Sequence, residues 1–210
     1  QRQIKNKEAP GLPDNTSSLL HHRTVFDDWR SISVAIYMAL VGYGVMVGIP
    51  VISTAWVSLL GFTEVQVGRI AGADLGGFSL GAVVVSLFVA KINRRLLVVI
   101  SAAVAITGNA LCITMISYEE TLWLRVIAGI GSGAFTAVAI ATLAGTSKPA
   151  RAFNILLFAF AFSQGGELYL LPKLAMNDIY LFFIVTYVVG LFFLAWLPPY
   201  PVEKSLDIEI

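Results

Sequence analysis

Three ionisable residues lie inside long apolar stretches of the sequence: Asp74, Arg125 and Glu167. The amide residues Asn109 and Gln164 lie in similar surroundings. A charged side chain is costly in hydrocarbon, so such residues pair with one another, face the protein interior or border a water-filled cavity. A carboxylate in that setting could take up and release a proton, and an arginine could hold an anionic group of a solute.

Each of these residues also has a purely structural interpretation. The two acids and Arg125 could form static ion pairs that lock helices together. Arg69 could extend its side chain to the outer interface, whereas Asn109 and Gln164 could form hydrogen bonds between neighbouring helices. Tyr43, which lies in the first apolar stretch, is a further candidate for contact with a solute.

The composition indicates the kind of fold that must position these residues. The chain has 210 residues, of which 57% are hydrophobic and 13% are charged, and its apolar residues form runs of about 20, the length of a membrane-spanning helix. These runs do not alternate polar and apolar residues, which excludes a transmembrane β-barrel. We therefore predict an all-α, polytopic membrane protein with six transmembrane helices at about 31–55, 66–90, 96–116, 121–145, 153–174 and 179–197.

The segments outside these runs define the predicted organisation. Residues 1–30 are polar and contain Pro10 and Pro13, so we expect a mostly disordered N-terminal tail. Residues 31–197 would form the six-helix bundle, and residues 198–210 the start of a linker or tail. All basic residues except Arg69, Arg125 and Lys173 fall on one side of this topology, which predicts that both termini are cytoplasmic.

Small residues recur at every fourth position in two of the predicted helices. The fourth helix has one such row, and the second helix has two adjacent rows. Such rows let a neighbouring helix approach closely, so we expect all three to be packing faces. Trp56 and Trp123 are expected in the interfacial belt. The rows are Gly129–Gly133–Ala137–Ala141–Gly145, Gly68–Gly72–Gly76 and Ala73–Gly77–Gly81.

The loop after the second helix carries a recognisable motif, SLFVAKINRRLLVVI. It resembles the G-x-L-A-D-R-x-G-R-R-x-x-L loop of the major facilitator superfamily of transporters. Lys91 takes the first basic position, and Arg94 and Arg95 match the arginine pair, while Ala90 stands where the family usually has aspartate. The resemblance implies a cytoplasmic gating loop formed by Lys91, Arg94 and Arg95, whose alternative role is to set membrane topology next to anionic lipid.

A second motif, in the fourth helix, is similar to the R-x-x-x-G-x-G pattern of the same family, with Arg125, Gly129 and Gly131 in place. Six helices with both ends inside also resemble the N-terminal half of such a transporter. Together these features cover about residues 31–200. The resemblance implies that the first, second, fourth and fifth helices border a central cavity, which would bring Asp74, Arg125 and Glu167 to one aqueous face.

From this resemblance we expect a secondary active transporter that moves a small organic solute by alternating access, coupled to a proton or another ion. Such transporters have two six-helix halves, so the expected partners include membrane lipids and either a missing C-terminal six-helix half or a second six-helix chain. The expected location is the bacterial inner (plasma) membrane. The alternative is a six-helix membrane scaffold or sensor whose buried charges are structural.

Other classes of function lack support in the sequence. No Gly-rich phosphate loop is present, because the glycines from Gly129 to Gly133 lie in a spanning helix without a following Lys-Ser/Thr. The histidines, His21 and His22, lie in the tail, and Cys112 is the one cysteine. We therefore expect no enzyme, no cofactor and no metal site. A net charge of +1 gives no indication of nucleic-acid binding.

Overall fold

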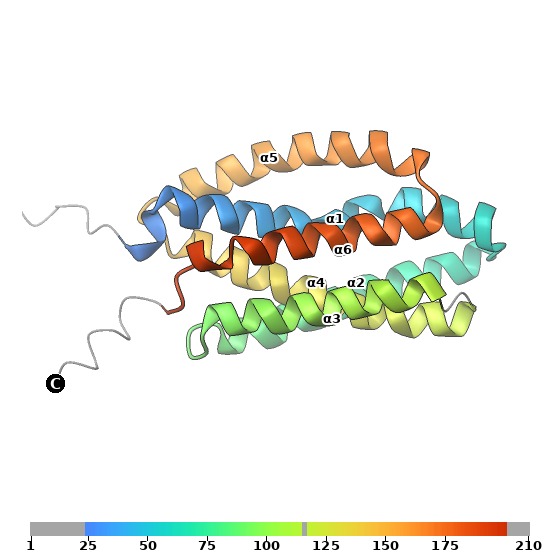
Figure 1. Cartoon of the computed structure of the whole chain (residues 1–210), viewed down its shortest axis with the longest axis horizontal. Helices are drawn as coiled ribbons and strands as arrows, with labels where there is room; N and C mark the ends of the chain where they lie inside the picture. The colour runs from blue at the N-terminus through green and yellow to red at the C-terminus, as the bar shows by residue number, and fades with distance from the viewer. Residues whose placement is uncertain (1–23, 115–116, 201–210) are drawn as a thin grey trace, which may run out of the picture.

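The computed structural model describes residues 24–114 and 117–200, and these ranges are helical without any strand (Figure 1). Their long helices are joined by short turns, and three short 3₁₀ turns flank or follow them. The elements are η2 (Val25–Asp27), α1 (Trp29–Leu60), α2 (Glu64–Phe88), α3 (Arg94–Thr114), α4 (Tyr118–Ala144), α5 (Pro149–Leu170), η3 (Leu171–Lys173), α6 (Met176–Phe192) and η4 (Leu194–Trp196).

Five of the described helices, α1 to α5, are long and apolar enough to cross a membrane. The sixth, α6, is apolar but has 17 residues, which gives a length of about 26 Å, slightly below the thickness of a typical hydrocarbon core. The prediction of an all-α chain with the character of an integral membrane protein is therefore confirmed.

Capping residues determine where the helices begin. The side chains of Thr63 and Ser117 each accept a hydrogen bond from the backbone N–H three residues on. The side chains of Gln66 and Glu120 in turn accept one from the backbone N–H of Thr63 and Ser117, which completes a capping box at each helix start. Hydropathy detects only the apolar middle of a helix, so the predicted starts lie two to three residues too late for α2 and α4. Helix α1 ends at Leu60, and the Gly61 that follows it has a left-handed φ of 70°, which suits glycine.

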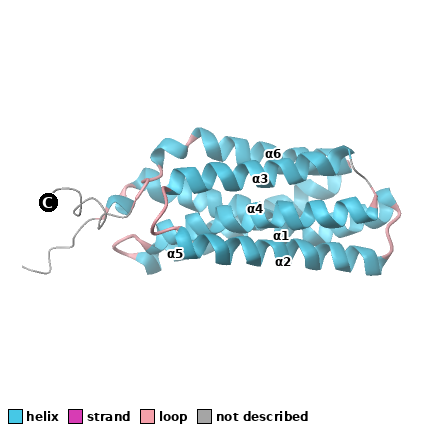
Figure 2. Ribbon diagram, turned by 90° about the horizontal axis from the view of Figure 1, so that it is seen from below, coloured by secondary structure: helices cyan, strands magenta, loops and turns pink. Residues whose placement is uncertain are grey.

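The helices form two interleaved groups of three. Helix α4 packs against α2 and α3, while α1 packs against α5 and α6, and the contacts of α1 with α4 and of α3 with α6 join the groups. Seen from below, α1 and α4 lie between a layer with α3 and α6 and a layer with α2 and α5 (Figure 2). The central pair thus carries the side chains that can meet in the interior.

The glycines of α2 and α4 allow these two helices to touch backbone to backbone. A Cβ atom on Gly77 or Gly81 would overlap carbonyl groups of α4, and one on Gly129 or Gly133 would overlap carbonyl groups of α2. On another face of α4, a Cβ on Gly131 would overlap α3. The predicted packing roles of Gly77, Gly81, Gly129 and Gly133 are therefore confirmed, and Gly131 adds a close contact on a second side of α4.

The other glycine row of α2 does not pack against any described helix, so the predicted packing face has no partner within this bundle. A Cβ added to Gly68, Gly72 or Gly76 would meet nothing within 4 Å. Two adjacent rows on one helix cannot both face the same neighbour. Asp74 lies on the same face as Gly77 and points into the interior, so the rotation of α2 leaves the Gly68–Gly72–Gly76 row uncovered.

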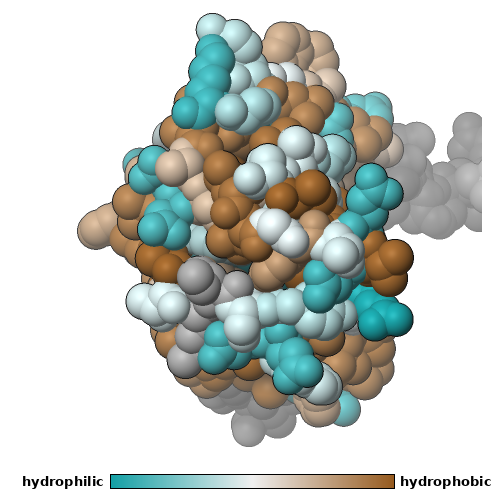
Figure 3. All heavy atoms as spheres, turned by 90° about the vertical axis from the view of Figure 1, so that its right-hand side faces the viewer, coloured by the Kyte–Doolittle hydropathy of each residue, from teal (hydrophilic) through white to brown (hydrophobic). Residues whose placement is uncertain are grey.

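The two ends of the bundle differ in what they carry. The first and last described residues lie at the same end, where the chain begins at η2 and finishes after η4 (Figure 1). The opposite end shows hydrophilic side chains interspersed with apolar ones (Figure 3). This end contains the first turns of α2, α4 and α6, which carry Glu64, Glu119 and Asp178.

Candidate functional site

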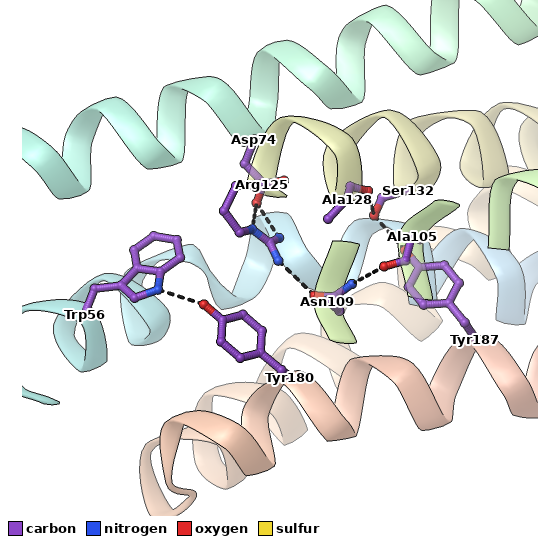
Figure 4. A network of polar contacts seen from close by, with 9 residues as sticks. All are labelled: Trp56, Asp74, Ala105, Asn109, Arg125, Ala128, Ser132, Tyr180 and Tyr187. Atoms are coloured by element: carbon purple, nitrogen blue, oxygen red, sulfur yellow. Dashed lines mark hydrogen bonds and ion pairs between the residues drawn. The ribbon is translucent and has the colours of Figure 1, made fainter. Parts of the chain in front are cut away.

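Arg125 of α4 lies at the centre of a polar cluster that joins three helices (Figure 4). Its side chain is 0% exposed, and its Nη2 donates to Asp74 Oδ2 on α2 at 2.6 Å. Its Nε donates to the same oxygen at 3.2 Å, and Nη1 donates to Asn109 Oδ1 on α3 at 2.8 Å. Asn109 in turn donates from Nδ2 to the Ala105 carbonyl at 2.8 Å. The cluster therefore couples the positions of α2, α3 and α4.

Only one oxygen of the Asp74 carboxylate takes part in this cluster. Both N–H groups of Arg125 bond to Oδ2, while Oδ1 is buried without a hydrogen-bond partner in the described ranges. Asp74 also lines a void of ≈ 10 Å³ between α1, α2 and α4, together with Met46 and Ser132. A void of this size is close to the smallest that holds one water molecule. Asp74 is thus paired with a cation and still has one acceptor available.

Two further hydrogen bonds between helices flank this cluster, and sequence reasoning did not find them (Figure 4). Trp56 Nε1 donates to the Tyr180 hydroxyl at 2.9 Å, and the Tyr187 hydroxyl donates to Ser132 Oγ at 2.7 Å. Trp56 is 0% exposed, so its predicted place in the interfacial belt was wrong, whereas Trp123 is 67% exposed. Tyrosine and tryptophan bury their polar atoms only where a partner is available, but hydropathy alone does not identify the partner.

Glu167 does not join Arg125. It lies on α5, where its Oε1 accepts a hydrogen bond from Ser163 at 3.3 Å and its Oε2 is buried without a partner among the described residues. Its carboxylate rests against Gly44 of α1. The structure therefore brings Asp74, Arg125 and Asn109 together, and places Glu167 at a separate cavity between α1, α5 and α6.

Tyr43 and Gln164 lie at a third location, a cavity of ≈ 600 Å³ between α1, α4 and α5. The walls of the cavity are mainly apolar, and the Tyr43 ring packs against Phe78 and Phe160 at centroid distances of 5.8 and 5.7 Å. Met46 lines both this cavity and the small void beside Asp74. Met46 is therefore a wall residue that the large cavity and the void beside the ion pair have in common.

The predicted gating-loop arginines, Arg94 and Arg95, bind neighbouring elements at one end of the bundle. Arg94 is buried, donates to Thr142 Oγ1 of α4 at 3.2 Å and lies 4.4 Å from the centre of the Phe26 ring. Arg95 donates to the carbonyl oxygens of Leu197 and Ala195 at 2.7 and 2.8 Å. These contacts tie the start of α3 to α4, to the η2 turn and to the chain after α6. Lys91 precedes them in the connection between α2 and α3.

The η2 turn is held against the end of α4 by Asp27. Asp27 Oδ1 accepts hydrogen bonds from the backbone N–H and the hydroxyl of Ser147 at 2.8 and 2.9 Å, and Oδ2 accepts one from Thr24 N–H at 2.7 Å. Burial alone would raise the pKa of Asp27, but the hydrogen bonds from Ser147 and Thr24 outweigh burial and hold the pKa below its ordinary value.

This lowered pKa gives a testable pH dependence. A group with a lowered pKa in the folded state stabilises above the pKa of the unfolded carboxyl, about 3.9, and this stabilisation is lost as pH falls through the lower folded value. We expect amide exchange of residues 24–28, corrected for its intrinsic pH dependence, to stay constant from neutral pH to about pH 5 and to accelerate below about pH 4. Asp27→Asn should accelerate it at neutral pH by up to about tenfold, and Asp178→Asn, at the opposite end, should leave it unchanged. Equal exchange in wild type and Asp27→Asn would contradict this role.

No cluster of three potential metal ligands occurs in the part of the chain that the structure describes. Comparison with protein-family models and with curated proteins gives no match to this chain.

Proposed function

We propose that this chain is the N-terminal six-helix half of a secondary active transporter of the major facilitator type, in a bacterial inner membrane with both termini cytoplasmic. It would move a small organic solute by alternating access, coupled to a proton. The observation that carries this proposal is the buried Asp74–Arg125 pair, whose Asp74 borders a small void that shares the wall residue Met46 with a cavity of ≈ 600 Å³. Ionisable residues inside membrane helices are typical of proton and substrate pathways.

In this proposal the proton is carried on Asp74. The ionised carboxylate holds Arg125 through Oδ2, and a proton that reached the free Oδ1 would remove the charge that holds the guanidinium. Helices α2 and α4 touch closely through glycines at the same level. A change in the pair would therefore act directly on this helix contact, which in this proposal has a second arrangement. Arg125 would alternatively hold an anionic group of the solute once Asp74 is protonated.

The solute would occupy the large cavity, whose polar groups include Tyr43 and Gln164. A mainly apolar cavity with few polar groups is typical of sites for small organic molecules. The uncovered Gly68–Gly72–Gly76 row of α2 supports the second part of the proposal, a further six-helix unit that packs on this face. That unit would be the C-terminal half or a second six-helix chain.

A membrane scaffold or sensor is the second candidate, and one observation favours it. Arg125 is fully buried, and its Nε, Nη1 and Nη2 are all engaged within the bundle. A static lock between α2, α3 and α4 would have the same geometry. The two candidates differ in whether the cavity beside α4 opens to both sides of the membrane.

Thiol labelling tests this difference without a known solute. In a Cys112→Ser background, Gln164→Cys places a thiol in the large cavity, and Phe162→Cys is the control on the same helix, at a position that is 69% exposed and would face lipid. We expect Gln164→Cys to react with a membrane-impermeant maleimide from either side of sealed vesicles, at least about tenfold faster than Phe162→Cys, because only a hydrated thiol ionises and reacts.

After correction for ionisation of the thiol itself, proton coupling predicts a further pH dependence of the labelling rate of Gln164→Cys, and Asp74→Asn or Glu167→Gln should remove this further dependence. Labelling from one side only would favour the scaffold. Labelling from both sides with an unchanged pH dependence in both variants would retain alternating access and exclude these carboxylates as proton carriers.

A further inference from the structure

We propose that the cavity between α1, α5 and α6 binds an organic ammonium ion, with the carboxylate of Glu167 as its counter-ion. This cavity has a volume of ≈ 330 Å³ and is distinct from the one that contains Tyr43 and Gln164. Its lining includes Glu167, Ser163 and the aromatic residues Tyr37, Phe182 and Phe183. This second site lies apart from the large cavity proposed for the solute, and the inference rests on the proposed transport function only for its biological meaning.

The Glu167 carboxylate has no counter-ion among the described residues. No basic side chain pairs with Glu167 within the described ranges, where the one ion pair is that of Arg125 with Asp74. The single hydrogen bond of Glu167 comes from Ser163 at 3.3 Å, and its Oε2 is buried without a partner. A carboxylate removed from water costs several kcal/mol unless it is paired, so a cation in the adjoining cavity would stabilise it.

Aromatic side chains form part of the walls of this cavity. The faces of aromatic rings attract cations, and the attraction increases when water is excluded. Tyr37 is fixed by the hydrogen bond from its hydroxyl to the Thr186 carbonyl at 2.9 Å, which keeps its ring at the wall of the cavity. Phe182 and Phe183 pack against each other with centroids 5.8 Å apart. One carboxylate among aromatic rings is the arrangement that suits an alkylated ammonium.

The same walls do not suit a metal ion. Calcium and magnesium bind six or more oxygen atoms, most of them from carboxylates, carbonyls and water. Glu167 is the only acidic residue among those that line this cavity, and no histidine or cysteine accompanies it. The lining therefore selects a cation that tolerates apolar contact, which is a property of organic ammonium ions.

Gly44 is the residue that leaves room for the carboxylate. A Cβ atom at this position would lie 3.0 Å from Glu167 Oε1 and 3.5 Å from Oε2. The carboxylate thus lies against the backbone of α1, and an alanine here would require it to shift by a few tenths of an ångström. Gly44→Ala is therefore a second variant that perturbs the site while Glu167 keeps its charge.

The experiment measures binding to the full chain in lipid nanodiscs, with choline as the probe and 3,3-dimethylbutan-1-ol as its uncharged analogue of the same shape. A ligand that binds only the folded state raises the thermal midpoint. We expect choline to raise it in a saturable way relative to sodium chloride at the same concentration, and the alcohol to have no such effect. Glu167→Gln should weaken choline binding at least about tenfold, since it removes a charge-assisted contact. Gly44→Ala should weaken it several-fold, and Glu119→Gln, which removes an exposed charge elsewhere, should bind like wild type.

Three outcomes would overturn the inference. Choline could fail to shift the midpoint, Glu167→Gln could retain the full shift, or the neutral alcohol could act as strongly as choline. A midpoint that responds to pH through Glu167 but not to choline would show that a proton occupies the site instead. Because binding is measured without a gradient, this result is separate from the labelling test of alternating access, and either proposal can fail while the other stands.

Discussion

Replacing Arg125 with methionine is expected to lower the free energy of unfolding by about 3–5 kcal/mol. The substitution keeps a long apolar side chain in the core but leaves the Asp74 carboxylate as a buried charge without its cation. It also removes the hydrogen bond to Asn109 Oδ1. The change is measured by equilibrium unfolding in bicelles, monitored by tryptophan fluorescence.

The matched comparison is the double variant Asp74→Asn/Arg125→Gln, which removes both charges and keeps polar groups in place. Because the main cost of the single substitution is an unpaired charge, the double variant should recover half or more of the lost stability. The interpretation fails if the double variant is as unstable as Arg125→Met, or if Arg125→Met costs less than about 1 kcal/mol. A stable double variant that also lost pH-dependent labelling of the large cavity would assign the pair a role beyond packing.

Gly81→Ala is expected to destabilise the protein by about 1–3 kcal/mol, because a single methyl group would force α2 away from α4. A Cβ at this position would overlap the Ile130 carbonyl oxygen and lie 2.8 and 2.9 Å from the carbonyl carbon and Cα of the same residue. These are backbone atoms in the middle of a helix and cannot turn aside as a flexible side chain can. The helices must therefore separate, which also weakens their other glycine contacts.

The control for this prediction lies five residues earlier on the same helix. Gly76→Ala would add a methyl group where nothing lies within 4 Å. We expect it to stabilise the helix by about 0.5–1 kcal/mol, since alanine loses less backbone entropy than glycine on folding. Equal effects of Gly76→Ala and Gly81→Ala on the free energy of unfolding would contradict the observed rotation of α2.

Helix α2 shows which features its sequence specifies and which depend on its neighbours. The sequence shows two glycine rows of equal quality and one aspartate, but nothing in the spacing says which row meets a partner. The rotation follows from tertiary contacts, because Asp74 must reach Arg125 and this places Gly77 and Gly81 against α4. A pattern within one helix specifies faces, and only the neighbour decides which of them is covered.

For the buried polar residues, too, the sequence specifies burial and the tertiary structure decides the partner. The cost of charge in hydrocarbon is a local property of a residue and its surroundings, so the sequence alone could predict that Arg125 faces the interior, and the side chain is fully buried. The choice of partner depends on atoms brought together from distant parts of the chain. Asp74 and Asn109 lie 51 and 16 residues from Arg125, and the structure selects both of them and leaves out Glu167.

By itself the sequence determined the helical, membrane-like character of this protein, the approximate extent of its long helices and the residues too polar to face lipid. These properties follow from runs of apolar residues and from the free energy of hydration, both of which act locally. Only the tertiary structure decided that the polar residues divide among three separate places: the ion pair, the cavity of Tyr43 and Gln164, and the cavity of Glu167. That division depends on helix rotation and on the close approach of backbones at glycines, which are properties of pairs of helices and are not encoded in the hydropathy of any one segment.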